Sequence, residues 1–487
     1  MKNLAYVACA LSLALVACRG GEGDDVGGDD MQNPDSPPIG GDVTIQEIQN
    51  DAMPSGTQVE LRGVVVTAID AYGNRTGDLF VSEPEGGPNS GVKVFGAPLE
   101  TLATLQVGDV VDITSAIKHE ACNEAAPCGT VVFDDGASIT EVMGVSAGSL
   151  VITKTGTAPL PTPVTVDAKA IAALATKAER VAEWEKYEGV LIKVINARQL
   201  SVTSPFGSNP GPDSNEFRIS GVARVQSVLA ELPNTATVGT CYESITGVGD
   251  FFFNNLVLPR SAADLVGGGT ACNPMASSIQ ELQTASTPPE LVNLTDVYVS
   301  AISFNKKNLW LSTSATAAAN NGVYVYRGPS SSTDVLPANV VVGAKVSVLG
   351  GAEEFDGNDG GDTVTQLTSP AITVAAGSPA TITPVTNQTV STLLASGTGE
   401  PYESVLVTLT NVKVNTVGTS TNNYLTDLAQ YPGATAFKAD DDIYRFVTGD
   451  ANACYASITG LWTYNAFEDQ YMFLPLAAGT GTGNCSN

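Results

Sequence analysis

One heptapeptide occurs twice in this sequence. The pattern Cys-Tyr-x-Ser-Ile-Thr-Gly begins at Cys241 and again at Cys454. Each copy is followed by an apolar run and a Leu-Pro, and a second cysteine, Cys272 or Cys485, lies 31 residues after the first. Two copies with equal cysteine spacing imply an internal duplication with a disulfide bond in each half, and they make a fold of repeated units the first expectation.

The remaining cysteines agree with an oxidising compartment. Cys122 and Cys128 form a third sequence-local pair, although spacing alone does not prove connectivity. Closing a loop of about 32 residues stabilises a fold by roughly 3–4 kcal/mol on the chain-entropy model. Structural disulfides of this kind are typical of extracytoplasmic proteins.

Composition sets the fold class and weighs against one class of partner. A chain of 487 residues predicts about three or four domains. Only 15% of the residues are charged, and many are Gly, Thr, Val and Ala, which suits a β-rich extracellular protein. The net charge of −28 repels phosphate backbones, so nucleic acid is an unfavoured partner.

The N-terminus reads as an export signal. Lys2 precedes a short apolar core at residues 4–14, so we interpret residues 1–17 as a signal peptide. The signal peptide is either that of a lipoprotein or an ordinary signal peptide that happens to contain a cysteine. No later segment approaches about 20 continuous apolar residues, the length that spans a bilayer.

The end of this segment, Leu15-Val16-Ala17-Cys18, resembles the bacterial lipobox. The resemblance implies cleavage before Cys18 and its acylation, with a fatty acid such as palmitate as the membrane anchor. Arg19 at the next position favours the outer membrane, facing either the periplasm or the outside. Residues 18–42, rich in Gly, Asp and Pro, then form a disordered acidic linker.

The first domain, residues 43–155, shows short β segments. Residues 58–68 form an expected strand with alternating apolar and polar positions at its start, and further strands are expected at 79–81, 91–95, 110–117 and 130–133. Five such segments suit a small Greek-key barrel. The order "TIQEIQ … VELRGVVVTA … LFVSEP … SGVKVF … L-x-VGD-x-V" resembles the OB-fold-like domains in the N-terminal region of secreted bacterial nucleases. The resemblance implies a fold and no particular ligand.

The rest of the chain repeats this organisation. A second domain, residues 156–275, holds the one clear helix, expected at 166–186, and a Tyr-Glu-Gly start that also resembles the nuclease region. Residues 278–283 echo 45–49, and Tyr402-Glu403 echoes Tyr187-Glu188. We therefore expect four OB-like Greek-key β-barrels in two duplicated pairs, with the third and fourth domains at 276–378 and 379–487.

Catalytic motifs are missing from the sequence. The resemblance to nucleases ends before their catalytic domain, which needs several His, Asp and Asn residues around a metal. This chain has one histidine, His119, which we interpret as a solvated side chain. Since no hydrolase, zinc-protease or phosphate-binding motif occurs either, we expect no enzyme.

Two sets of residues are candidates for binding. An acidic, glycine-rich loop carries hard oxygen ligands of the kind calcium prefers, at Asp356, Asn358, Asp359 and Asp362. Its spacing is not that of an EF-hand, and a hairpin tip would use the same residues for their turn geometry. Asp440-Asp441-Asp442 and Asp134-Asp135 invite the same two interpretations.

Aromatic side chains form the second set. Trp310, Tyr324, Tyr326, Trp462 and Tyr464 are able to stack on sugars or bases, although buried core positions explain such residues equally well. Few basic residues lie among them, so a glycan or a protein is a better partner than nucleic acid.

Together these observations predict a non-catalytic, lipid-anchored cell-envelope protein that displays tandem binding modules for a glycan or protein. One alternative is a nucleic-acid-binding accessory protein related to secreted nucleases. Another is a calcium-dependent adhesion or matrix protein.

Overall fold

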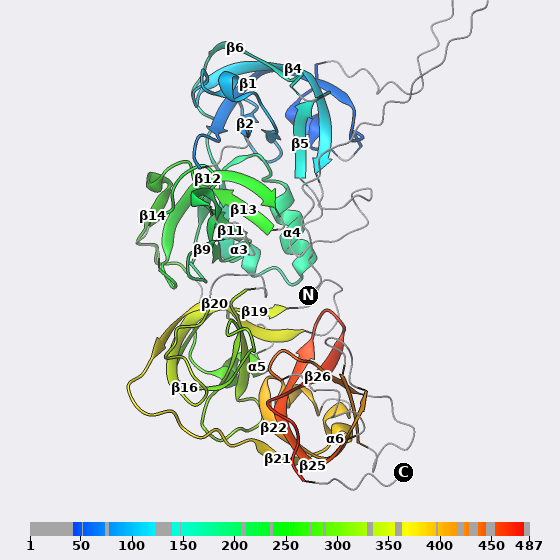
Figure 1. Cartoon of the computed structure of the whole chain (residues 1–487). Coiled ribbons are helices and arrows are strands. Elements are labelled where there is room, and N and C mark those ends of the chain that lie inside the picture. The colour runs from blue at the N-terminus through cyan, green and yellow to red at the C-terminus, as the bar shows by residue number, and fades with distance from the viewer. Residues whose placement is uncertain are drawn as a thin grey trace, which may run out of the picture. The chain divides into compact units, whose positions relative to one another are not determined.

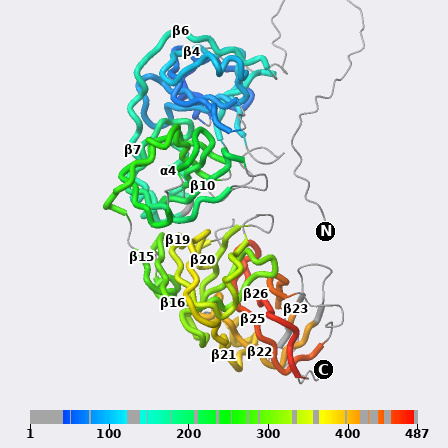
Figure 2. Tube along the Cα trace, turned by 60° about the vertical axis from the view of Figure 1, so that its left-hand side comes forward, coloured from blue at the N-terminus to red at the C-terminus, as the bar shows by residue number. Residues whose placement is uncertain are grey.

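Four β-sheets follow one another along the part of the chain that the structure describes (Figures 1 and 2). The computed structural model describes residues 42–481. Within this range it leaves out residues 51, 74–76, 122–138, 147, 206–210, 222, 234–236, 253, 273–274, 286–288, 329–334, 356–362, 396–397, 417–422, 428–436 and 445–452. Strands dominate these residues and the helices are short, so the all-β expectation is confirmed.

The first sheet closes on itself as a five-stranded barrel. Its strands run in the order β1-β2-β3-β5-β4, β1 also pairs with β4, and β6 extends β4. The β3–β5 pairing is parallel and the others are antiparallel. The strands are β1 (Gln58–Ile69), β2 (Leu79–Ser82), β3 (Gly91–Val94), β4 (Asp109–Ala121), β5 (Ile139–Gly144) and β6 (Val151–Thr157).

Sequence chemistry explains why this barrel closes. The long strands β1 and β4 change register beside Gly63, which has a φ of 66°, and this lets a strand bend around the core. Helix α1 (Ile45–Ile48) begins at a capping box between Thr44 and Glu47 and buries both of its isoleucines. A second short helix is α2 (Leu99–Leu102). The strand expected at residues 130–133 lies outside the described residues, and β5 supplies the partner of β4.

The second sheet carries two helices where the sequence predicts one. The single helix expected at residues 166–186 is wrong: strand β7 (Val164–Asp167) is followed by α3 (Ala168–Ala172) and α4 (Lys177–Glu185). Thr176 accepts the backbone N–H of Glu179, and Glu179 in turn accepts the N–H of Thr176. This capping box starts a new helix and interrupts the old one.

The remaining strands of the second sheet follow the order β7-β8-β12-β13-β11-β10-β9, with β14 on β12. They are β8 (Leu191–Ile195), β9 (Ser204–Pro205), β10 (Asn215–Ile219), β11 (Ala223–Gln226), β12 (Tyr242–Phe252), β13 (Asn254–Leu258) and β14 (Leu265–Gly267). The short 3-10 helices are η1 (Pro212–Ser214) and η2 (Ala262–Asp264).

The third sheet repeats the strand order of the first. Its barrel runs β16-β17-β18-β20-β19 and closes through β16–β19, with β15 added to β16. Helix α5 (Ile279–Thr284) begins at Ser278 and buries Ile279 and Leu282. The strands are β15 (Met275–Ala276), β16 (Leu291–Ile302), β17 (Leu309–Ser312), β18 (Gly322–Tyr326), β19 (Lys345–Phe355) and β20 (Val364–Val374).

The fourth sheet closes in the same way. The order β22-β23-β24-β26-β25 is joined by β22–β25, and β21 extends β22. The strands are β21 (Val385–Gln388), β22 (Val405–Thr416), β23 (Asn423–Asp427), β24 (Phe437–Ala439), β25 (Cys454–Asn465) and β26 (Gln470–Pro475). Helix α6 (Val390–Leu394) and the 3-10 helix η3 (Glu400–Tyr402) precede β22.

The repeated heptapeptide lies on β12 and β25, at equivalent places in their sheets. The Cys241–Cys272 disulfide is confirmed, with Cα atoms 5.9 Å apart. Cys454 is also disulfide-bonded, while its expected partner Cys485 lies outside the described residues.

The domain limits expected at 155/156 and 275/276 fall inside or beside strands. β6 runs on to Thr157 as part of the first sheet, and β15 begins the third sheet at Met275. Among the described residues, no helix has the length and apolar character needed to cross a membrane.

Candidate functional site

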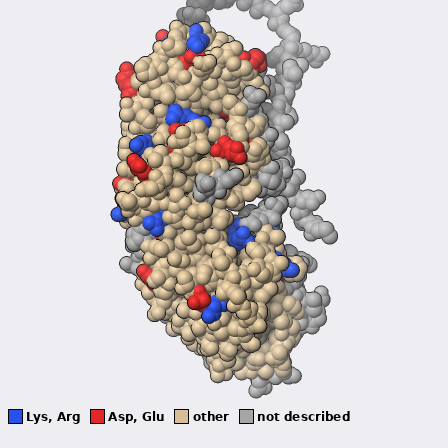
Figure 3. All heavy atoms as spheres, turned by 90° about the vertical axis from the view of Figure 1, so that its left-hand side faces the viewer, with Lys and Arg blue, Asp and Glu red and all other residues tan. Residues whose placement is uncertain are grey.

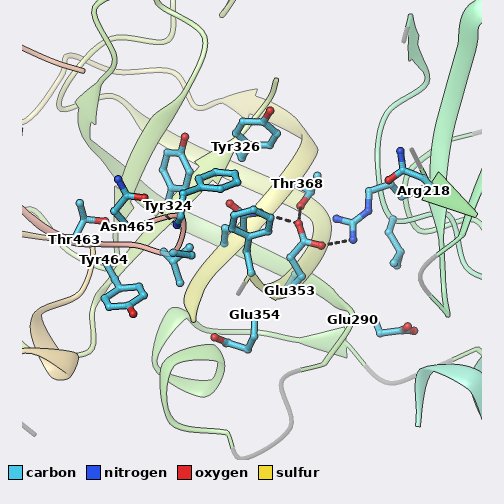
Figure 4. Close-up of a pocket in the computed structure, with 18 of the residues that line it drawn as sticks. Arg218, Glu290, Tyr324, Tyr326, Glu353, Glu354, Thr368, Thr463, Tyr464 and Asn465 are labelled. Atoms are coloured by element: carbon cyan, nitrogen blue, oxygen red, sulfur yellow. Dashed lines mark hydrogen bonds and ion pairs between the residues drawn. The ribbon is translucent and has the colours of Figure 1, made fainter. Parts of the chain in front are cut away.

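The described residues enclose a cavity of about 850 Å³ (Figure 4). Strands of the third and fourth sheets supply most of its lining, and α3, α4 and the strands of the second sheet supply the rest. The size falls within the range of small-molecule sites. Because the lining residues come from segments more than 100 residues apart in the chain, only folding brings them together.

One wall of the cavity is aromatic. Trp310 on β17 pairs across the strands with Tyr324 on β18, and their ring centroids are 5.0 Å apart. Tyr326 follows two residues later on the same face of the strand, and its ring centroid lies 6.4 Å from that of Tyr324. Tyr464 on β25 and Phe355 on β19 also line the cavity. Sheet pleating therefore points alternate residues of β18 into one space.

Four of the five aromatic residues proposed from the sequence reach this cavity. Trp310, Tyr324, Tyr326 and Tyr464 line it. Trp462 does not: it is 0% exposed and stacks on Phe437, with ring centroids 4.8 Å apart. Trp462 is therefore a core residue of the fourth sheet, and its proposed binding role is wrong.

A polar network continues the row of cross-strand neighbours beyond the aromatic residues, because Tyr324 pairs with Gln366 and Gln366 pairs with Glu353. No local pattern in the sequence marks this network. Glu353 on β19 forms an ion pair with Arg218 on β10. The same carboxylate accepts hydrogen bonds from Thr368 at 2.6 Å and from Gln366 at 2.8 Å (Figure 4). Burial opposes ionisation of Glu353, but Arg218 and these donors outweigh it and lower its pKa. Glu353 is thus held as a carboxylate whose charge is stabilised by the ion pair with Arg218 and by the two hydrogen bonds.

Acidic side chains of the fourth sheet complete the lining. Asp440 and Asp442 follow β24 and reach the cavity. The Asp442 carboxylate is accessible, but the surrounding walls remove part of its water, and this raises its pKa to about 6 with help from the charges of Asp440 and Asp441. Lys438 opposes the shift only weakly, because it already pairs with Asp440 and Glu468.

Two donors at the cavity have no acceptor within the described part of the chain. The indole N–H of Trp310 is buried and unpaired, in a side chain that is 2% exposed. One terminal nitrogen of Arg218, Nη1, is unpaired as well. Since buried donors are normally satisfied, an oxygen acceptor inside the cavity would complete the hydrogen bonding of these two groups.

The other candidates from the sequence are not part of this site. His119 is not simply solvated: its Nδ1 lies 2.8 Å from Glu141, and this hydrogen bond raises the pKa of the imidazole against the effect of burial. The cross-strand pairing of β4 with β5 brings the two residues together.

Apart from Asp440-Asp441-Asp442, the metal candidates fall outside the described residues, as do the expected Cys122/Cys128 pair and the anchor cysteine. These are Asp134, Asp135, Asp356, Asn358, Asp359, Asp362, Cys122, Cys128 and the anchor residue Cys18. Among the residues that the structure describes, no group of three or more His, Cys, Asp or Glu side chains is arranged to hold a metal ion.

No protein-family model matches the sequence, and no curated protein matches it either.

Proposed function

We propose that the chain consists of four OB-like barrels in two duplicated pairs. The order β1-β2-β3-β5-β4, closed by β1–β4, is that of a five-stranded Greek-key barrel, and β16–β20 follow it strand for strand. Helices α1 and α5 each bury two apolar residues at the same place before the first barrel strand.

Matching contacts in the two halves support the duplication. Glu188, after α4, accepts the backbone N–H of Thr140 on β5 at 3.2 Å. Glu403, after η3, accepts the N–H of Thr365 on β20 at 3.0 Å. Both glutamates are buried, and both follow a tyrosine in the sequence.

The same two threonines make a second matching contact. The hydroxyl of Thr140 donates to Glu120 on β4 at 3.0 Å, and the hydroxyl of Thr365 donates to Glu354 on β19 at 2.9 Å. A common ancestor for the halves explains why these two contacts recur at equivalent register positions.

We further propose that the protein is a non-catalytic, lipid-anchored cell-envelope protein that binds a glycan in the cavity described above. The observation that carries this proposal is the combination of an aromatic wall with fixed polar groups. Flat rings such as Tyr326 offer apolar faces for stacking, and the Glu353, Gln366 and Arg218 network offers acceptors and donors for hydroxyl groups.

Charge favours a glycan over nucleic acid. On the face drawn in Figure 3, the Lys and Arg side chains of the described residues are scattered among Asp and Glu and form no continuous basic stripe. Phosphate backbones need such a stripe, and the net charge of −28 opposes them further.

Binding of immobilised neutral and amino oligosaccharides to the purified protein tests this function. Tyr326→Ala removes a stacking face and should weaken binding about tenfold. The matched control is Tyr298→Ala, which changes a tyrosine on β16 that packs against Lys345 and does not line the cavity. Binding of no oligosaccharide, or an equal loss in both variants, would refute the proposal.

The lipid anchor has its own test. Cys18→Ser should leave the protein unacylated and release it from the membrane fraction. Metabolic labelling with palmitate that persists in the variant would rule Cys18 out as the acylated residue.

A further inference from the structure

The first half of the chain shows what occupies the position equivalent to the cavity. Phe80 pairs with Lys93 across β2 and β3, as Trp310 pairs with Tyr324 across β17 and β18. Lys93 also pairs with Glu141 on β5, as Tyr324 pairs with Gln366 on β20. Lys93 and Tyr324 therefore occupy the same register position in the two barrels.

In the first half this position holds an ammonium group. Lys93 Nζ lies 3.2 Å from Asp78 and 3.3 Å from Asp250, and 5.9 Å from the ring centroid of Phe80. Burial alone would lower the pKa of Lys93, but the two carboxylates outweigh burial and raise it. The arrangement of one aromatic ring and two carboxylates thus stabilises a buried cation.

In the second half the lysine and the acidic groups around it are all replaced by neutral residues, since Asn308 and Gln366 stand at the places of Asp78 and Glu141. Tyr324 replaces the lysine, and Thr463 stands at the place of Asp250 in the repeated heptapeptide strand. Burial, followed by the charge of Asp442, raises the pKa of Tyr324, so its hydroxyl remains neutral. The Asp442 carboxylate is near enough to Tyr324 to act on it, yet forms no ion pair within the described residues.

The arginines that line the cavity are already engaged. Arg218 pairs with Glu353, and Arg224 pairs with Glu216, which does not line the cavity. Arg180 donates to the carbonyl of Leu174. Acidic lining residues, namely Glu290, Glu353, Glu354, Asp440 and Asp442, outnumber these three arginines. A ligand that brings positive charge would therefore reduce repulsion at the end of the cavity that Asp442 occupies.

We propose that the cavity binds the ammonium group of an amino sugar, with Asp442 as the ion-pair partner and Tyr324 and Tyr326 as the aromatic surface beneath the sugar. This inference rests on the proposed glycan-binding function and specifies its ligand class. The unpaired indole N–H of Trp310, which also lines the cavity, is the donor for a sugar hydroxyl. The carboxylate, the rings and the indole thus serve three different groups of one sugar.

Isothermal titration calorimetry on the intact protein tests the inference with three tetrasaccharides of β-1,4-linked sugars. They are built from glucosamine, from N-acetylglucosamine and from glucose, so they differ in one substituent per ring, and only the glucosamine oligomer carries amines that take up a proton. We expect the glucosamine oligomer to bind about tenfold more tightly than the other two at about pH 7.

Asp442→Asn should remove this preference, because it should weaken binding of the glucosamine oligomer far more than binding of the glucose oligomer. The backbone carbonyl of Asp442, which accepts the N–H of Phe304, is retained in the variant, and a thermal unfolding curve checks that it is folded. The control Asp296→Asn neutralises an exposed carboxylate on β16, 3.9 Å from Lys345 and outside the cavity lining.

The outcomes separate the inference from the function on which it rests. Equal affinity for the three oligomers, or an equal loss for all three in Asp442→Asn, would overturn the ammonium site and leave glycan binding in place. Binding of none of the three would overturn the inference, and an array without any bound oligosaccharide would overturn the function as well. A preference for the amine that Asp442→Asn abolishes and Asp296→Asn leaves intact supports both.

Discussion

Replacing the buried Glu403 tests how the strands of the third and fourth sheets are joined. Glu403 is 1% exposed, one of its oxygens accepts the N–H of Thr365, and Oε2 has no partner in the described part of the chain. Burial, followed by the charges of Glu400 and Glu354, raises its pKa well above the ordinary value. The folded protein therefore favours the neutral acid. The stability that Glu403 contributes is present at acidic pH and is lost as the pH rises through this raised pKa.

The magnitudes of two substitutions follow from these contacts. Glu403→Ala leaves the Thr365 N–H without an acceptor, which costs about 1–3 kcal/mol. At roughly 2–4 °C per kcal/mol for a folded unit of 150–250 residues, Tm falls by about 2–12 °C. Glu403→Gln keeps an acceptor and removes the charge. It should match the wild-type protein near about pH 5 and exceed it increasingly toward about pH 8.

Differential scanning calorimetry across this pH range measures both effects. Glu188→Gln and Glu188→Ala are the matched pair in the first half, because Glu188 makes the same contact with Thr140 and its pKa is also raised by burial. Glu100→Gln on α2 is the exposed control. A Gln variant that loses as much stability as the Ala variant at every pH would refute the idea of a neutral buried acid, as would a Tm difference that does not grow with pH.

Other perturbations probe the disulfide, the buried lysine and the cavity. Cys272→Ser should lower the free energy of unfolding by roughly 3–4 kcal/mol, because the bond to Cys241 closes a 31-residue separation, and chemical denaturation with and without reductant measures the loss. Lys93→Met should destabilise by about 3–5 kcal/mol, since Asp250 would remain buried without its cation, and adding Asp250→Asn should restore part of the loss in the same assay. Glucosamine-oligomer affinity should fall as the pH drops through about 6, because protonated Asp442 no longer attracts an ammonium group, and calorimetric titrations at several pH values would show no such trend if Asp442 played no part.

The sequence predicted the strands of the first sheet better than the helices of the second. Alternating residues at the start of 58–68 predicted β1, and short apolar segments beside turn residues predicted β2 and β3, each within a few residues of the observed bounds. The helical pattern at 166–186 concealed a break, since apolar periodicity continues through Thr176 while the capping box there ends one helix and starts the next.

Only some of the residues that line the cavity could be predicted from the sequence. Aromatic residues such as Tyr324 and Tyr326 stood out by type, and the structure brings them together. Nothing local marks Arg218 or Glu353, because their ion pair joins residues 135 positions apart. The same limit explains Trp462, which resembles Tyr464 in the sequence but stacks within the core of the fourth sheet.

If the two halves are duplicates, as proposed, the register position of Lys93 and Tyr324 is filled in two different ways. In the first half, Lys93 and Asp250 form an ion pair, so the space between the strands is closed by groups that neutralise each other. In the second half, Tyr324 and Thr463 stand in their places and form no ion pair, so the neighbouring acidic groups face a cavity. In the first half an internal ammonium group neutralises two buried carboxylates, whereas in the second half Asp442 lines the cavity and forms no ion pair among the described residues, so an ammonium group of a ligand would be its partner.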